Sequence, residues 1–139
     1  MSEQQPTIND TQQLYFDLFK RVQYNLLDGQ RVVADLLNWR ELWYSVLPVR
    51  LPYLFPNQDD KQNHPYTEVS MLRTIRHGDY PFDTLYIWTT DQALPLLRRR
   101  IEERWEASEV AVLTPETDEE MRLAHLDDAQ DRVLFVWWD

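Results

Sequence analysis

Apolar residues in the last third of the chain form three short runs separated by helical patterns. Residues 84–90, 109–113 and 132–138 are rich in β-branched, aliphatic and aromatic side chains. Short runs of this kind are typical of strands, whereas the segments between them carry helical spacing and helix-start signals. The order strand, helix, strand, helix, strand predicts a layered domain of helices packed on a sheet.

The helix expected over residues 91–105 has the strongest pattern. Asp91 is placed to cap its start, and Pro95 falls in the first turn, where a missing N–H costs little. A second helix is expected to begin at Thr114-Pro115 and to bury Met121. The residues expected on the buried face of the first helix are Leu94, Leu97, Ile101 and Trp105.

The N-terminal part predicts a helical hairpin. Its first helix would be capped by Asn9, Asp10 or Thr11 and would end at Asp28-Gly29, with the second helix beginning near Gln30. The apolar positions expected on the buried face of the first helix are Leu14, Tyr15, Leu18, Phe19, Val22 and Leu26; those of the second are Val32, Val33, Leu36, Leu37 and Tyr44.

Between the hairpin and residue 84 the pattern is less decisive. Residues 42–47 fit either a helix extension or a strand, and Pro48, Pro52 and Pro56 restrict any strand here to a sheet edge. Residues 55–65 are expected to form a polar loop, and residues 67–76 a short helix.

These elements together predict an α/β or α+β fold, in which an N-terminal helical hairpin precedes a βαβαβ-like unit. The unit would form one mixed sheet of three to five strands, and helix-linked strands favour right-handed parallel crossovers. We expect residues 1–8 to be a disordered tail and residues 9–139 to form a single globular domain.

Composition excludes several classes of function. The chain has no cysteine and only two glycines, Gly29 and Gly78. The absence of cysteine excludes thiolate catalysis and cysteine-bound metals. The sequence contains neither of the glycine-rich phosphate-binding motifs G-x-x-x-x-G-K-[ST] and G-x-G-x-x-G. We expect no cofactor.

The net charge of the chain limits the classes of partner that it can bind. The formal net charge is −10, and residues 106–139 contribute −8 of it, from ten acids and two arginines. Such a surface repels phosphates of nucleic acids and anionic membranes. It is either a solvated face that promotes solubility or a docking surface for a basic partner. The first residues lack the pattern of a signal peptide, and no apolar run approaches the roughly 20 residues of a membrane span. We expect a cytoplasmic protein.

The segment Arg76-His77-Gly78-Asp79 resembles the Arg-His-Gly element of the histidine phosphatase superfamily. The resemblance implies a histidine that takes up a phosphoryl group and an arginine that holds its oxygens. In that family the element follows a buried strand, whereas the residues before His77 have a helical pattern. We therefore interpret His77 as a helix C-terminal residue, which the helix dipole favours.

A small hydrolase or transferase is the enzymatic alternative. It would pair a histidine with a nearby carboxylate, and the candidate residues are His64, Arg76, His77 and His125. The histidines lie far apart in the sequence and in no metal-ligand spacing, so we expect no metal site.

The aromatic residues favour a different function. Six tryptophans are many for one small core, and Trp137 and Trp138 point to opposite faces if residues 132–138 form a strand. Tryptophan and tyrosine anchor many protein interfaces. We therefore expect a non-catalytic interaction or regulatory domain that binds a protein partner or itself, with an acidic inhibitor or immunity-type protein as a further alternative. The candidate partner-binding residues are Trp43, Tyr53, Phe55, Trp137 and Trp138.

Overall fold

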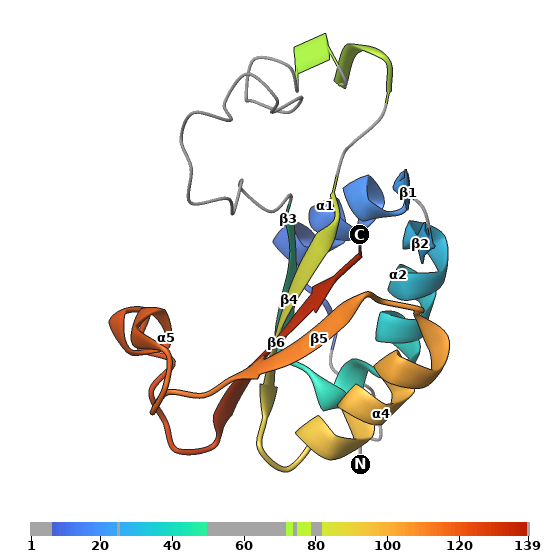
Figure 1. The fold of residues 1–139 in the computed structure, drawn as a ribbon. Coiled ribbons are helices and arrows are strands. Elements are labelled where there is room, and N and C mark those ends of the chain that lie inside the picture. Colours follow the sequence, from blue (N-terminus) through green and yellow to red (C-terminus); the bar gives the residue numbers. More distant parts are fainter. Residues whose placement is uncertain (1–6, 25, 50–71, 74, 79–81, 139) are drawn as a thin grey trace, which may run out of the picture.

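A computed structural model describes residues 7–24, 26–49, 72–73, 75–78 and 82–138 (Figure 1). Its elements in chain order are α1 (Asp10–Phe19), β1 (Gln23–Tyr24), β2 (Leu27–Asp28), α2 (Gly29–Asn38), the 3-10 helix η1 (Arg40–Leu42), β3 (Ser45–Val49), β4 (Thr84–Thr90), α4 (Leu94–Arg104), β5 (Glu109–Leu113), α5 (Glu119–Leu123) and β6 (Asp131–Trp137).

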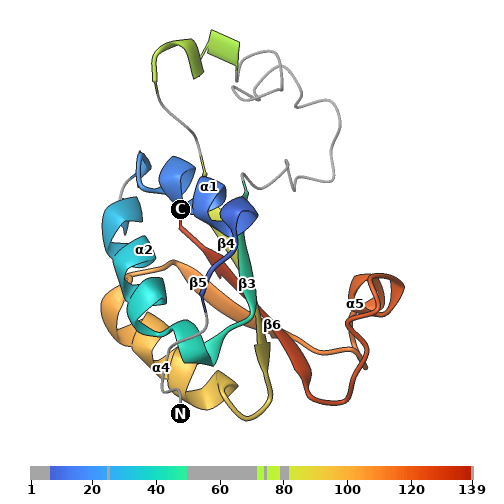
Figure 2. The same ribbon diagram turned by 180° about the vertical axis from the view of Figure 1, so that it is seen from behind.

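The centre of the fold is a four-stranded sheet with the order β3-β4-β6-β5. Helices α1, α2 and α4 cover one face, and α5 lies on the other side (Figures 1 and 2). This arrangement confirms the predicted combination of helices and one sheet. Within the described part of the chain no helix is long and apolar enough to cross a membrane.

The pairing of the strands differs in one respect from the mixed sheet that was predicted. Strands β4 and β5 run parallel and are linked by α4, but β6 lies between them and is antiparallel to both. The result is a split β-α-β unit, in which every hydrogen-bonded pair of the four-stranded sheet is antiparallel.

The helical hairpin is shorter than its apolar pattern predicted. Helix α1 ends at Phe19, and the small β1–β2 hairpin separates it from α2. Gly29 therefore begins α2 instead of ending the first helix, and Asp28 caps it by accepting a hydrogen bond from the Arg31 N–H. A Cβ at Gly29 would lie 1.9 Å from the Phe19 carbonyl oxygen, so this close approach requires glycine.

The buried face of the first helix was predicted correctly in part, since Phe19 and Val22 are buried and Leu18 packs against the core. Gln12, Phe16 and Phe19 are buried, whereas Leu14 is 65% exposed and Leu26, beyond the helix, is 62% exposed. Asn9 caps α1 as expected, with its side chain accepting from the Gln12 N–H at 2.8 Å. In the second helix, Val32, Val33 and Leu36 are buried as predicted, while Leu37 and Tyr44 are exposed.

The strand predictions for residues 84–90, 109–113 and the C-terminal run are confirmed, and Ser45–Val49 is the proline-containing edge strand. The helix starts need correction. Helix α4 begins at Leu94, and the Thr90 hydroxyl, not Asp91, accepts from the Ala93 N–H. Helix α5 begins after Asp118, since Pro115 lies in a turn.

A tryptophan stack joins the covering helices to the sheet. The ring centroids of Trp39 and Trp105 lie 5.6 Å apart, and those of Trp105 and Trp138 lie 6.1 Å apart. Asp35 of α2 is buried beside them and accepts two hydrogen bonds from Arg104 and one from the Trp105 ring N–H. Satisfying a buried carboxylate in this way fixes α2 against α4.

Candidate protein-interaction surface

The face of the sheet opposite α1, α2 and α4 carries aromatic side chains. Side chains alternate along a strand, so the residues out of phase with the buried Leu85, Ile87 and Leu134 point to this side. We call this surface the open face; its apolar residues are Leu47, Tyr86, Trp88, Ala111, Leu113, Val133, Phe135 and Trp137, together with Tyr44 just before β3. Tyr44 and Leu47 are 53% and 43% exposed.

The rings on the open face are held in pairs. The centroids of Tyr44 and Trp88 lie 4.8 Å apart, and those of Tyr86 and Phe135 lie 5.4 Å apart. The Trp88 ring N–H donates to the buried Asp131 carboxylate at 3.0 Å. Rings fixed in this way lose little conformational entropy on binding, which favours their use as anchors.

An acidic segment borders this face. Residues 114–130, which we call the acidic arm, leave β5, form α5 and return to β6 on the open side of the sheet (Figure 1). Met121 is buried at the arm, while Glu119 and Glu120 are exposed. Partial burial, followed by the charges of Glu120 and Asp118, raises the pKa of Tyr86 above its ordinary value. Tyr86 is therefore a neutral hydroxyl at physiological pH, next to carboxylates.

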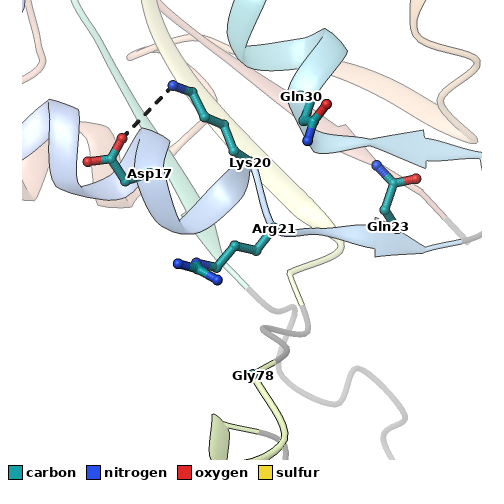
Figure 3. A pocket seen from close by; sticks show the side chains of 6 residues that line it. All are labelled: Asp17, Lys20, Arg21, Gln23, Gln30 and Gly78. Atoms are coloured by element: carbon teal, nitrogen blue, oxygen red, sulfur yellow. Dashed lines mark ion pairs between the residues drawn. The ribbon is translucent and has the colours of Figure 1, made fainter.

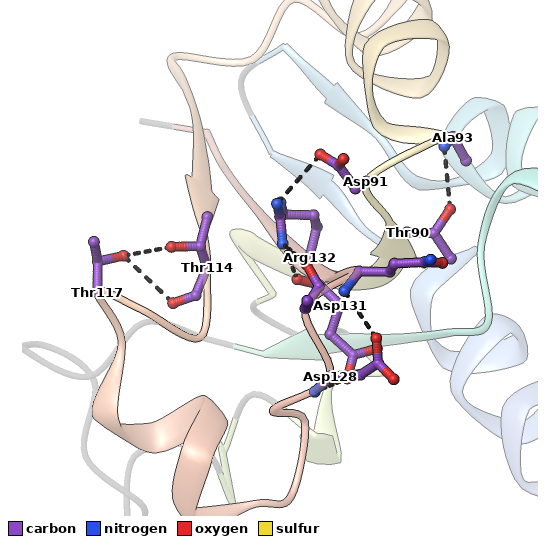
Figure 4. Close-up of polar contacts among 10 residues, drawn as sticks. Thr90, Asp91, Ala93, Thr114, Thr117, Asp128, Asp131 and Arg132 are labelled. Carbon is purple, nitrogen blue, oxygen red and sulfur yellow. Dashed lines mark hydrogen bonds and ion pairs between the residues drawn. The ribbon is translucent and has the colours of Figure 1, made fainter.

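Polar contacts hold the base of the acidic arm (Figure 4). The Asp128 N–H donates to Asp131 at 3.1 Å, and Thr114 and Thr117 share a hydrogen bond of 2.9 Å. Arg132 pairs with Asp91 at 3.3 Å. Hydrogen bonds within the turns at residues 114–117 and 128–131 thus fix both ends of the acidic arm where it joins the sheet.

A polar pocket of about 260 Å³ lies at the Tyr44 end of the open face. Glu41 contributes a carboxylate, and Gln92 and Gln130 contribute carboxamides. Tyr44 and Trp43 supply aromatic walls, and among the described residues Glu41 is the only carboxylate of the lining. One carboxylate with amide and aromatic neighbours is a suitable environment for a cationic side chain.

A second hollow, of about 680 Å³, lies beside the end of α1, strand β1 and the start of α2 (Figure 3). It is lined by Asp17, Lys20, Arg21, Gln23, Gln30 and Gly78. Lys20 and Asp17 are 4.0 Å apart and both are largely exposed. An exposed pair of this kind is worth little, and the described lining contains no serine, threonine or histidine.

The structure distributes the predicted partner-binding residues differently. Trp43 and Trp138 are buried, and their ring N–H groups donate to the carbonyls of Leu36 and Trp105. Both rings therefore belong to the core and are not available at the surface. Trp137 is partly exposed and lies on the open face, so the opposite orientation of the two neighbouring tryptophans is confirmed. Tyr53 and Phe55 lie outside the described residues.

The histidine candidates give no assembled site among the described residues. Arg76, His77 and His125 are exposed, and the segment containing His77 lies at the opposite end of the sheet from α5 (Figures 1 and 2). The His77 N–H donates to the Arg73 carbonyl, and Gly78 has a φ of 86°, which together form a helix end. His64 lies outside the described residues, so the hydrolase alternative stays a prediction.

No group of three or more potential metal ligands occurs among the residues that the structure describes. The aspartates at 127, 128 and 131 form a turn in which Asp131 bonds to Trp88 and to the Asp128 backbone. The side-chain oxygens of Asp128 and Asp131 thus have structural partners.

The sequence prediction missed most of the open face. Tyr44 was assigned to the core, and Tyr86, Trp88 and Phe135 were not identified, although their alternation with Leu85, Ile87 and Leu134 marks one face of a strand pair. Comparison with protein-family models, curated proteins and solved structures gives no match to this chain.

Proposed function

We propose that this protein is a non-catalytic interaction domain whose open face binds a basic surface of a partner protein. The observation that carries the proposal is the combination of ordered, partly exposed aromatic rings with the acidic arm beside them. Aromatic residues supply most of the energy at many interfaces, and charges at the rim govern encounter and specificity.

The acidic arm and the pocket both favour cations in the partner, and they lie at the same end of the strands, since Gln130 of the arm also lines the pocket. The arm presents Glu119 and Glu120, and the pocket presents Glu41 next to Tyr44. Beside them, Trp88 and Tyr86 offer ring faces over which lysine or arginine stems can pack. A basic protein surface with two cationic sites matches this arrangement.

Recovery of a partner from lysate of the source organism, quantified by mass spectrometry, tests the proposal. The double variant Tyr44→Ala/Leu47→Ala removes exposed apolar surface and should reduce recovery of the dominant partner at least tenfold. Leu14→Ala/Leu26→Ala removes a similar exposed area from the helical side and should leave recovery unchanged. Equal recovery by both double variants would refute the role of the open face.

Charge reversal separates aromatic docking from electrostatic inhibition. Glu119→Lys/Glu120→Lys changes the acidic arm, and Asp10→Lys/Asp17→Lys makes the same change on α1, which covers the other face of the sheet (Figure 1). Only the first pair should weaken binding. A steep loss of affinity with added salt would favour the acidic-inhibitor form of the function, and a shallow dependence would favour docking through the aromatic rings.

A further inference from the structure

The two edges of the sheet expose different backbone groups. Along an antiparallel strand, residues alternate between bonding to the inner neighbour and pointing outward. Trp138 bonds to the Asp83 carbonyl and Asp91 to the Gln130 carbonyl, which fixes the phase of the β4–β6 ladder. The same alternation continues through the β3–β4 and β6–β5 pairings. The outward residues are therefore Val46 and Pro48 on β3, and Val110 and Val112 on β5.

Strand β3 is closed to a further strand. Gln12, buried on α1, donates its side-chain N–H to the Val46 carbonyl at 2.9 Å and accepts from the Val46 N–H at 2.9 Å. Its carboxamide thus makes both bonds that an added strand would make at this residue. Pro48, the other outward residue, has no N–H to offer.

Strand β5 remains open. Arg98 donates to the outward Val110 carbonyl at 3.3 Å, but its side chain is 42% exposed and is shared with Glu102. The outward N–H and C=O of Val112 have no partner among the described residues. Val110, Ala111, Val112 and Leu113 are all partly exposed, so both faces of the strand offer apolar contact to a neighbour.

The surroundings of β5 specify the chemistry of that neighbour. Glu109 is exposed and points to the open face, and β5 leads directly into the acidic arm with its exposed Glu116. On the α4 side, Arg98 already supplies a cation. An added strand therefore fits best with basic residues facing the Glu109 side and neutral residues facing α4. A second copy fits less well because each chain carries a charge of −10.

We propose that β5 accepts an extended basic segment of the partner as an additional antiparallel strand, bonded to the outward backbone of Val110 and Val112. The inference rests on the proposed function, since it gives the binding mode for the same basic partner. The added strand would prolong the open face beyond Ala111 and Leu113, which neighbour Phe135 and Val133 in the register.

A synthetic peptide tests this directly. In the sequence Lys-Thr-Lys-Val-Lys-Thr-Lys, the lysines would face Glu109 and the Thr and Val residues would face α4. Residues opposite Val110 and Val112 share their side, so the N–H groups of Thr and Val would point at β5. N-methylation of the second and fourth residues should weaken binding at least tenfold, whereas methylation of the third and fifth should change it less than threefold.

The protein side of the test uses Val112→Pro. Proline is tolerated where an edge N–H faces outward, as Pro48 shows in β3, so the sheet should form without the donor. Val112→Ala is the matched control, since it trims the same side chain and keeps the N–H. We expect the proline variant to bind the unmethylated peptide at least tenfold more weakly than the alanine variant, and peptide binding to slow amide exchange at Val112 in the unsubstituted protein at least tenfold.

Several outcomes would overturn the inference. Equal binding of the two methylated peptides, no binding of any of them, or unchanged exchange at Val112 would show that β5 pairs with no basic strand. Self-association of the unsubstituted chain that Val112→Pro abolishes would make a second copy the occupant. If Val112→Pro keeps the partner from lysate while Tyr44→Ala/Leu47→Ala loses it, the proposed function stands and the strand-addition mode fails.

Discussion

Strands β3 and β5 are the two edges of one sheet, and they differ in how their outward backbone groups are treated. At β3 a buried glutamine from α1 bonds to both outward groups of Val46, and the next outward residue is a proline. At β5 the only side-chain contact to an outward group among the described residues is that of the half-exposed Arg98. An unpaired edge invites pairing with another chain, and proteins usually block it.

The difference shows that each edge strand is protected from pairing by the residues that lie next to it. The β3 edge is adjacent to α1, so a helix side chain can reach it, whereas β5 lies on the opposite edge next to the acidic arm. Acidic residues such as Glu109 discourage pairing between identical chains while leaving the backbone accessible. An edge protected only by charge remains available to a segment of opposite charge.

A proline at an inward residue of β5 should lower the unfolding free energy more than any other change considered for the two edges. Ala111 points its N–H toward β6, so Ala111→Pro should remove a ladder bond and cost about 3 to 4 kcal/mol of unfolding free energy. Val112→Pro should cost about 1 kcal/mol, because its N–H has no internal partner. Chemical denaturation of the two variants measures both, and equal losses would mean that the phase assigned to β5 is wrong.

Opening the β3 edge should have the next largest effect. Gln12→Leu keeps a side chain of similar size but leaves the Val46 N–H and C=O without partners in a buried position, so we expect a loss of about 2 to 3 kcal/mol. Gln13→Leu is the control, since the Gln13 side chain bonds only to the exposed Asp17. A loss below about 1 kcal/mol for Gln12→Leu would show that water replaces the carboxamide and that β3 is not closed.

The role of Gln12 could not be predicted from the sequence. A polar residue within an apolar pattern usually marks the exposed side of a helix. Gln12 can be buried because its side chain bonds to Val46, which is 34 residues away in the sequence. Trp43 can likewise be buried because its ring N–H donates to the Leu36 carbonyl. Such positions depend on tertiary contacts that no local pattern encodes.

The strands were predictable because their signals are local. Residues 84–90 and 109–113 combine β-branched or aliphatic residues with clear boundaries, and Pro48 restricted the first strand to an edge. The length of α1 was overestimated because apolar spacing continues through Val22 to Leu26, while the chain turns at β1 and β2. Of the predicted partner-binding residues that the structure describes, only Trp137 lies on the open face.

A smaller effect concerns the contact of Arg98 with β5. Arg98→Met removes a part-buried hydrogen bond of 3.3 Å and an exposed ion pair of 3.6 Å, so the unfolding free energy should fall by no more than about 1 kcal/mol. Binding of the basic peptide should strengthen by up to about threefold, because a competing cation and carbonyl contact are gone. Arg104→Met, which leaves the buried Asp35 without its cation, should destabilise several times more. Weaker peptide binding by Arg98→Met would instead make Arg98 part of the binding site.

The smallest effect is a shift in the titration of Tyr86, which reports whether the acidic arm stays beside the sheet. Burial and the carboxylates of Glu120 and Asp118 raise the pKa of Tyr86 above 10.0, so the folded state holds this proton more tightly than the unfolded chain does. Its contribution to stability is present below the ordinary tyrosine pKa and falls as the pH rises from there toward the raised value. Glu120→Gln should lower the pKa of Tyr86 part of the way, and Glu119→Gln should lower it less.

The Tyr86 ring carbon signal in NMR, identified by its absence in Tyr86→Phe, follows this titration. A Tyr86 that titrates like an ordinary tyrosine in the unsubstituted protein would place the arm away from the ring in solution. The open face would then lose its acidic border while β5 kept its unpaired backbone, and recognition of a basic segment would depend on Glu109 and the strand edge alone. A raised pKa that Glu120→Gln reduces would keep the two features, open edge and acidic border, on one continuous surface.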